Sequence, residues 1–336
     1  MSRTSRAFVR RSVTVALVIG AAATLAGLAS GATNEKVTSI AAIDKHGDNP
    51  YFIRQELGVK RLAARLHFKA TIQDVGFDAN KMLSTLDTVI AAGAQGVMTT
   101  VPDQKLGPVV IDKARKAGIP IVATNDPIKD SKGKYIPFIG FNARSFGGQV
   151  GVVAAKLYDK AKAGWGSDST KIASIEQNSL SVCKDRTDGA AAAFFKAEPK
   201  FGRDNIVHIA YDNSAANAIT VMGTTITAHP EVKHWIIWSC NDDGVVGAVR
   251  ALENANFATS ASIGVGLGGN QTCQEFAKKK VTSYAATIYV DAADVGQTAA
   301  QLLYDNISTG KKIPLNTFLP GAFVNRSNYH KVMAEC

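Results

Sequence analysis

The segment Cys240–Asp243 places an amide and two carboxylates at a point where the chain is predicted to change from strand to helix. Before it, Val232–Trp238 is an apolar, β-favouring run without clean alternation, which predicts a strand buried on both faces. After it, apolar residues follow helical spacing, and Asp242 or Asp243 could cap that helix. Asn241 offers both a donor and an acceptor, which suits adjacent hydroxyl groups, and doubly wound sheets bind ligands at such turns.

Two earlier loops carry chemistry of the same kind. The loop that begins at Asp44 is polar and ends in the aromatic pair Tyr51-Phe52. Polar groups there could meet sugar hydroxyls while an aromatic face stacks on the C–H face of the ring; the alternative is a turn with a hydrophobic staple. Asp126 follows the strand predicted at Ile119–Thr124, and its carboxylate could accept two hydroxyl hydrogen bonds, although Asn-Asp-Pro is also an ordinary turn.

The segment 179–189 contains Arg186, whose planar, five-donor guanidinium is suited to gripping several sugar oxygens. The same segment contains Ser181-x-x-Lys184, the first element of a serine β-lactamase pattern, but Ser-Asp-Asn and Lys-Thr-Gly do not occur. The sequence also has no G-x-S-x-G, no H-E-x-x-H and no P-loop, and its histidines are scattered. No catalytic set emerges from these residues.

Gly264–Gly269 has the form G-x-G-x-x-G after a predicted strand, with Asp291 downstream, and so meets the dinucleotide fingerprint formally. The helix that would follow, Gln271–Lys279, is short, and nicotinamide or flavin cofactors are uncommon in exported proteins. We therefore expect no cofactor and interpret this loop as part of a ligand cleft.

These loops require a scaffold of alternating strands and helices. Such β/α units predict a mostly parallel sheet with helices on both faces. The predicted strands are too many for one sheet, and a break near residues 142–170 indicates two similar lobes with a cleft between them, a preferred place for small ligands. The predicted strands are 37–43, 70–75, 96–100, 119–124, 135–141, 171–175, 206–211, 232–238, 262–267 and 283–290.

The N-terminal residues predict an exported protein. Residues 1–12 contain four arginines and no acid, Val13–Ala29 is apolar or small, and Ser30-Gly31-Ala32 fits a signal-peptidase site, so residues 1–32 are predicted to be a signal peptide. Arg10-Arg11 leaves both general and twin-arginine export open. Removing four arginines from the net charge of +10 leaves +6, spread along the chain, which argues against nucleic-acid binding.

Four cysteines in an exported chain permit disulfides, with three full pairings open: Cys183, Cys240, Cys273 and Cys336. Cys183 and Cys240 each follow a predicted strand, so a bridge near the cleft is one of these pairings. No cysteine precedes Cys183, which excludes a lipid-attached cysteine at the cleavage site, and no Cys/His spacing suggests a metal site.

Three motifs, Pro102–Gly107, Lys113–Arg115 and His229–Ala251, give the chain a close resemblance to the L-arabinose-binding branch of the periplasmic sugar receptors of ABC importers. The resemblance runs through the whole chain after the signal peptide. It implies an α/β, type I periplasmic binding protein fold with two doubly wound, Rossmann-like lobes joined by a hinge. It places the N-terminal lobe at residues 36–144, completed by about 290–316, and the C-terminal lobe at 145–289, completed by about 317–336.

The resemblance also implies a function without chemistry. The chain would be a periplasmic monomer that binds a monosaccharide or polyol and presents it to an ABC permease in the inner membrane. The alternative is a sugar sensor that passes its liganded form to a chemoreceptor or histidine kinase. A helix-turn-helix sugar-responsive repressor is excluded because a predicted signal peptide occupies the position of its DNA-binding segment.

Ligand-contacting positions follow from the same resemblance. Four polar contact types are kept, at Lys45, Asp126, Arg186 and Asn241, whereas Asn49, Gly268 and Gln271 replace a glutamate, an asparagine and an aspartate. The pocket would thus lose negative charge, keep Asp126 as its main acid and gain space near Gly268, so L-arabinose is not expected to be preferred. The full predicted set is Lys45, Asn49, Tyr51, Phe52, Thr100, Asp126, Phe141, Leu180, Arg186, Cys240, Asn241, Gly268 and Gln271.

Overall fold

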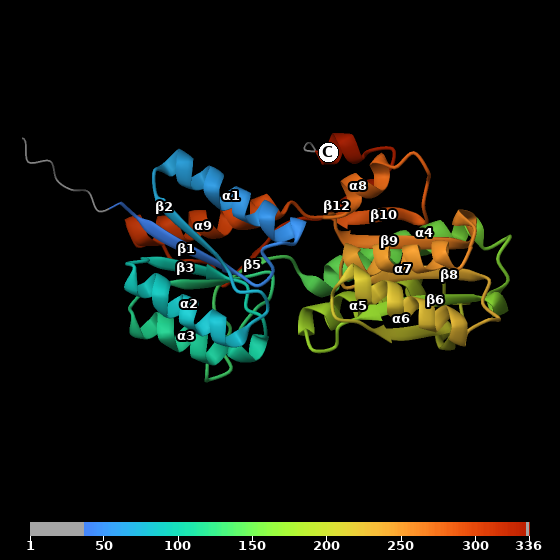
Figure 1. Cartoon of the computed structure of the whole chain (residues 1–336), viewed down its shortest axis with the longest axis horizontal. Coiled ribbons are helices and arrows are strands. Elements are labelled where there is room, and N and C mark those ends of the chain that lie inside the picture. The colour runs from blue at the N-terminus through green and yellow to red at the C-terminus, as the bar shows by residue number, and fades with distance from the viewer. Residues whose placement is uncertain (1–36, 334–335) are drawn as a thin grey trace, which may run out of the picture. The chain divides into compact units, whose positions relative to one another are not determined.

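A computed structural model describes residues 37–333 and 336, so the predicted signal peptide lies outside the described residues. The first sheet has the strand order β11-β5-β4-β3-β1-β2, and all its strands are parallel. The helices α1 and α9 cover one face of this sheet, and α2 and α3 cover the other (Figure 1). The bounds are β1 (Ser39–Asp44), α1 (Pro50–Leu66), β2 (Lys69–Asp74), α2 (Ala79–Ala91), β3 (Gly96–Thr99), α3 (Gly107–Lys116), β4 (Ile121–Thr124), β5 (Phe138–Gly140), α9 (Ala292–Thr309) and β11 (Asn316–Phe318).

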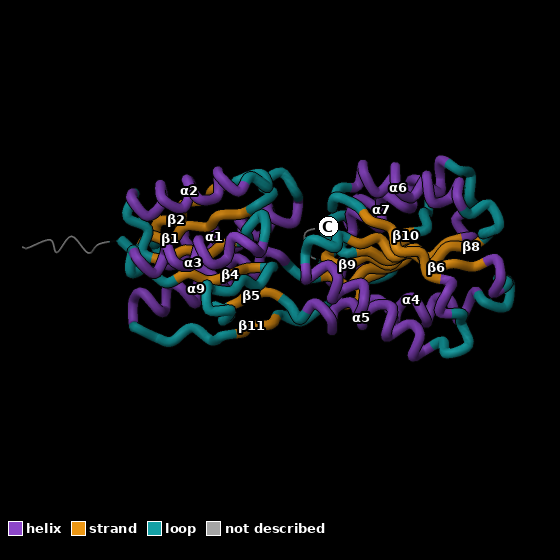
Figure 2. Tube along the Cα trace, turned by 90° about the horizontal axis from the view of Figure 1, so that it is seen from below, coloured by secondary structure: helices purple, strands orange, loops and turns teal. Residues whose placement is uncertain are grey.

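The second sheet repeats this arrangement in the order β12-β10-β9-β8-β6-β7, with β12 as an antiparallel edge strand. Figure 2 shows α4 and α5 on one face and α6 and α7 on the other. The bounds are α4 (Ala143–Ala161), β6 (Thr170–Glu176), α5 (Ser181–Ala197), β7 (Ile206–Ala210), α6 (Ala215–Ala228), β8 (His234–Ser239), α7 (Asp242–Asn254), β9 (Ser262–Gly268), α8 (Thr272–Ala277), β10 (Tyr284–Tyr289), β12 (Ala322–Asn325) and α10 (Tyr329–Val332). Short 3₁₀ helices lie at Gln104–Leu106, Ser167–Ser169, Arg203–Asn205 and Thr259–Ala261.

Each sheet and its helices form one lobe, and the prediction of two doubly wound α/β lobes is confirmed. The chain passes between the two sheets three times: between β5 and α4, between β10 and α9, and between β11 and β12. In each lobe the strand order reverses beside its first strand, β1 or β6, which is where such sheets bind ligands.

The ten predicted strands correspond to β1–β10, whereas β11 and β12 have no counterpart in the prediction. β11 has only three residues, and it and β12 are partly exposed edge strands, so neither shows an apolar run or clean alternation. β8 illustrates the opposite case, since Trp235 and Trp238 are both fully buried among the helices that cover its two faces.

Glycines allow two helix pairs to approach backbone to backbone. A methyl group on Gly147 of α4 would lie 1.8 Å from the carbonyl oxygen of Arg186 in α5. In the first lobe, a methyl group on Gly296 of α9 would lie 2.0 Å from the carbonyl oxygen of Gln55 in α1. Only glycine fits at such distances, so these two positions fix how closely α5 and α1 sit against their neighbours.

The structure selects one of the three open cysteine pairings. Cys183 pairs with Cys240, and Cys273 pairs with Cys336, with Cα–Cα distances of 4.8 and 5.3 Å. The first bridge joins the start of α5 to the loop after β8, and the second joins α8 to the C-terminal residue. Among the described residues, no helix combines the length and hydropathy needed to span a membrane.

We expect the double substitution Cys273→Ser/Cys336→Ser to lower the free energy of unfolding by about 2–5 kcal/mol, because the lost cross-link would no longer restrict the unfolded chain. Urea denaturation of the oxidised proteins measures the difference. Peptide mapping without reductant checks the connectivity, and a peptide that joins Cys183 to Cys273 or Cys336 would contradict it.

Candidate functional site

A cavity lies at the carboxyl ends of strands from both sheets. The empty space in it, counted together with open solvent at its mouth, is about 630 Å³. The first lobe contributes residues that follow β1, β4 and β5, and the second contributes residues that follow β6 to β8 or lie at and after the end of β9. The lining residues are Lys45, His46, Asn49, Tyr51, Phe52, Asn125, Asp126, Phe141, Leu180, Val182, Arg186, Asn213, Cys240, Asn241, Asp243, Leu267, Gly268 and Asn270.

Lys45 and Asp126 form a buried ion pair on the first-lobe side of this cavity. Lys45 follows β1 and Asp126 follows β4, so the sheet brings together two residues that are 81 positions apart. Asn125 precedes Asp126 with a left-handed backbone (φ 61°), a conformation that asparagine tolerates better than most residues. The two charges offset each other, and Lys45 contacts only one of the two carboxylate oxygens of Asp126.

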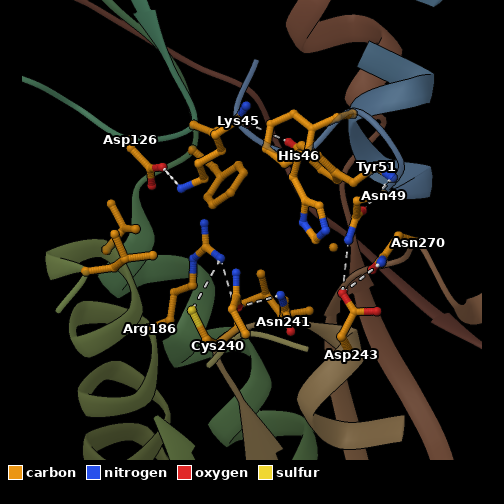
Figure 3. A pocket seen from close by; sticks show the side chains of 18 residues that line it. Lys45, His46, Asn49, Tyr51, Asp126, Arg186, Cys240, Asn241, Asp243 and Asn270 are labelled. Carbon is orange, nitrogen blue, oxygen red and sulfur yellow. Dashed lines mark hydrogen bonds and ion pairs between the residues drawn. The ribbon is translucent and has the colours of Figure 1, made fainter. Parts of the chain in front are cut away.

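Arg186 reaches from α5 into the middle of the cavity, toward Lys45 and Asp126 (Figure 3). Its Nη1 donates to the Cys240 carbonyl oxygen at 2.9 Å, and its guanidinium lies 4.6 Å from the centre of the Phe141 ring. Its buried Nε has no hydrogen-bond partner among the described residues. Burial lowers the pKa of Arg186 and the Asp126 carboxylate raises it, so a charged donor group stands partly unused in the cavity.

Asn241 is the N-cap of α7, which corrects the expectation that Asp242 or Asp243 would cap this helix. Its Oδ1 accepts from Gly244 N at 3.2 Å and from the Tyr211 hydroxyl at 3.0 Å. Its Nδ2 donates to Asn213 Oδ1 at 2.8 Å. Because the oxygen is already used, Asn241 offers the cavity its remaining amide hydrogen rather than a donor and an acceptor together.

Asp243 carries a second buried carboxylate at the cavity wall and is surrounded by amides. It accepts from Asn49 Nδ2 at 3.4 Å, from Asn270 Nδ2 at 3.2 Å and from Gln271 Nε2 at 2.7 Å. Figure 3 shows Asp243 with Asn49 and Asn270 on the opposite side of the cavity from Asp126. Asp126, which was expected to be the main acid of the cavity, is therefore accompanied by a second acid, Asp243.

A buried polar network lies behind the first-lobe wall. Asp44 accepts from Gln55 Nε2 at 2.8 Å and from the Thr100 hydroxyl at 3.2 Å. Asn125 Nδ2 donates to Gln55 Oε1 at 2.7 Å, and its Oδ1 accepts from the Tyr51 hydroxyl at 2.8 Å. Burial raises the pKa of Asp44 to about 7, against the two hydrogen bonds that lower it, and its Oδ2 has no hydrogen-bond partner in the described part of the chain.

Eleven of the thirteen predicted site residues line the cavity, and Thr100 and Gln271 do not. Thr100 is fully buried behind the wall, where its hydroxyl lies 2.8 Å from that of Thr124. Gln271 follows Asn270 and holds Asp243 by a hydrogen bond. Their assignment as ligand contacts rested on the resemblance alone, and the role of every residue in the set stays a prediction.

Seven of the lining residues were not predicted from the sequence as site residues. Two of them, Asn125 and Asn213, are asparagines with left-handed backbones in the loops after β4 and β7. For Asn125, its position directly after the strand was an available signal. Asp243 was interpreted as a cap, and Asn270 stands next to the position taken from the family pattern. The seven are His46, Asn125, Val182, Asn213, Asp243, Leu267 and Asn270.

The cavity walls also have apolar surface, from side chains such as Phe52, Phe141 and Leu180. Within residues 37–333 and 336, no group of three or more histidine, cysteine, aspartate or glutamate side chains could hold a metal ion. The arrangement is suited to binding a small polar molecule: donors and acceptors converge from two lobes, and aromatic rings can cover a C–H face.

We expect the substitution Asp44→Asn to flatten the pH dependence of stability. Asp44 in the folded chain has a pKa raised to about 7 from an ordinary 3.8, so its contribution is complete below pH ~4 and is lost as the pH rises through 7. Between pH 5 and pH 8 the free energy of unfolding of the wild type should fall by about 2–3 kcal/mol from this residue, and Asp242, whose pKa burial raises to about 6, adds a fall of the same sign.

Urea denaturation at several pH values measures this slope for Asp44→Asn and for a control, Asp204→Asn, at an exposed carboxylate of the 3₁₀ helix Arg203–Asn205 in the other lobe. An unaltered slope in Asp44→Asn would mean that Asp44 is ionised throughout this range.

The chain was compared with known proteins. A family model described as periplasmic binding protein domain matches residues 40–312. The ABC transporter L-arabinose-binding periplasmic protein of Azospirillum brasilense is 29% identical, and the alignment covers 100% of this chain and 99% of that protein. The L-arabinose-binding periplasmic protein of Escherichia coli (strain K12) is 27% identical, with 78% of this chain and 83% of that protein covered.

Solved structures share the fold. The Caulobacter myo-inositol binding protein bound to myo-inositol superposes with a TM-score of 0.75 at 17% identity, covering 89% of this chain and 97% of that chain. A periplasmic solute binding protein of an ABC transporter from Actinobacillus succinogenes 130z with bound D-allose gives 0.73 at 21%, covering 88% and 99%. With the family model spanning most of its length, this chain belongs to the periplasmic binding protein family.

Proposed function

We propose that the chain is the solute-binding component of a carbohydrate ABC importer and binds one monosaccharide or related polyol in the cavity between its lobes. The observation that carries the proposal is the cavity itself, in which Arg186 and the Lys45–Asp126 pair meet aromatic walls at the carboxyl ends of both sheets. The names of the relatives agree with this class of ligand, since they include L-arabinose-binding and ribose import binding proteins.

The proposal includes no chemical step. The polar residues of the cavity are engaged in hydrogen bonds that hold or orient them, and the relatives are binding proteins. We further propose export to the periplasm through residues 1–32, release of the ligand to a permease, and lobe boundaries near residues 144, 290 and 316. No feature of the described residues favours the sensor alternative, so importer function is the one we propose.

The first test is a panel of sugars. We expect L-arabinose to bind weakly or not at all and another sugar to be preferred, because Asn49, Gly268 and Gln271 change the polar groups that would meet it. Thermal-shift screening followed by calorimetric titration with L-arabinose, D-ribose, D-galactose, D-allose and myo-inositol measures this. A hundredfold excess over Kd adds about 2.7 kcal/mol to stability. Sub-micromolar binding of L-arabinose, tighter than every other sugar tested, would contradict the prediction.

The second test concerns Arg186. We expect Arg186→Ala to weaken the binding of the preferred sugar of that panel at least about a hundredfold, because two charge-assisted hydrogen bonds contribute about 1.5–3 kcal/mol each. The fold should survive, since within the described residues Arg186 donates to one backbone carbonyl. Calorimetry and circular dichroism measure the two effects.

The matched control is Arg203→Ala, an exposed arginine of the same lobe whose guanidinium lies 5.0 Å from the centre of the Phe195 ring, away from the cavity. Near wild-type affinity in Arg186→Ala would show that the sugar binds elsewhere.

A further inference from the structure

Asp243 was expected from the sequence to be a possible cap of the following helix, but its side chain is held at the cavity wall by other side chains. It is 6% exposed, lies in the first turn of α7, and accepts hydrogen bonds from three side-chain amides. No ion pair joins it to a cation among residues 37–333 and 336, whereas Asp126 is paired with Lys45. Its three donors are neutral amides, so its carboxylate oxygens act as acceptors at this end of the cavity and no described cation is paired with them.

The amides that hold Asp243 come from both lobes. Asn49 belongs to the start of α1 in the first lobe, while Asn270 and Gln271 follow β9 in the second. The Oδ1 atom of Asn49 accepts from the Tyr51 backbone N–H at 2.9 Å, so only its Nδ2 group can point across the cavity. Asn49 therefore presents a donor to the cavity, and Asp243 presents an acceptor beside it.

Asp243 also has acceptor capacity to spare. A carboxylate has about four acceptor positions, and three donors reach this one. Two of the three contacts, at 3.2 and 3.4 Å, both fall on Oδ2 and are long for N–H···O bonds. A hydroxyl group in the cavity could therefore join or displace one of these amides without leaving a buried donor far from an acceptor.

We infer that Asp243 is a specificity-determining residue, which accepts a hydrogen bond from a ligand hydroxyl at the end of the ligand farthest from Asp126. The inference rests on the proposed function and deepens it by naming the chemistry of that end: a neutral hydroxyl donor is accepted, and a carboxylate or phosphate is repelled. Because Asn49 and Asp243 belong to different lobes, a hydroxyl bound at Asp243 also touches the contact between the lobes.

The experiment combines ligand and protein changes. The probes are the tightest-binding sugar among L-arabinose, D-ribose, D-galactose and D-allose, together with its complete set of monodeoxy analogues. Calorimetric Kd values are measured for the wild type, for Asp243→Asn, and for Asp185→Asn, a control at an exposed carboxylate of α5 outside the cavity.

We expect one deoxy analogue to bind the wild type and Asp185→Asn about ten- to hundredfold more weakly than the parent sugar because it lacks the hydroxyl that Asp243 reads. In Asp243→Asn the same analogue and the parent sugar should bind within about threefold of each other, since the charged acceptor is gone. The other analogues should keep their wild-type ratios, which a general loss of structure would not allow.

Two results would overturn the assignment: wild-type ratios for every analogue in Asp243→Asn, or equal loss across all of them. If the wild type binds its sugar and Asp243→Asn keeps the wild-type ratio of analogue to parent Kd for every analogue, the role of Asp243 is contradicted but the proposed function is not. A wild type that binds neither these four sugars nor myo-inositol counts against the proposed function.

Discussion

Parallel pairing of the strands determines where the polar groups of this chain meet. Within each sheet all strands except β12 run in the same direction, so the loop after each strand emerges beside the loops of its neighbours, and each lobe has its order reversal at β1 or β6. Lys45 and Asp126 thereby become neighbours although 81 positions separate them. A polar residue directly after a buried strand lies at the carboxyl edge of its sheet, and most of the polar cavity residues are in loops or helix starts at this edge.

Close approach of helices then sets the depth at which these groups lie. The contact of Gly147 with the Arg186 carbonyl oxygen fixes the height of α5 against α4, and the contact of Gly296 with the Gln55 carbonyl oxygen fixes α1 against α9. Arg186 belongs to α5, and Tyr51 belongs to α1. A side chain at either glycine would have to push a helix outward, which would withdraw a cavity residue as well as loosen the core.

The strand–helix alternation could be predicted because it depends on local periodicity, and ten strands follow from it. β11 and β12 could not, because a three- or four-residue edge strand buries too little for an apolar signal and is defined by its partners. The site followed the same division. Asp126, just after a strand, and Arg186, in the first half of α5, were predicted from pattern and resemblance, and both line the cavity. The position of Thr100 behind the wall and the hydrogen bond from Gln271 to Asp243 depend on tertiary packing, which residue spacing does not reveal.

Helix capping explains why the cavity has the donors it has. Asn49 and Asn241 are both N-caps, on α1 in one lobe and α7 in the other, and each turns its Oδ1 to a backbone N–H of its own helix. An amide in that orientation has only its N–H groups left for the cavity. The same hydrogen bond that caps the helix therefore makes the side chain a donor at the cavity wall. The two carboxylates that line the cavity, Asp126 and Asp243, add charge-assisted acceptor positions on opposite sides of it. The N-caps thus supply donors to the cavity, and the two acids supply acceptors at its two ends.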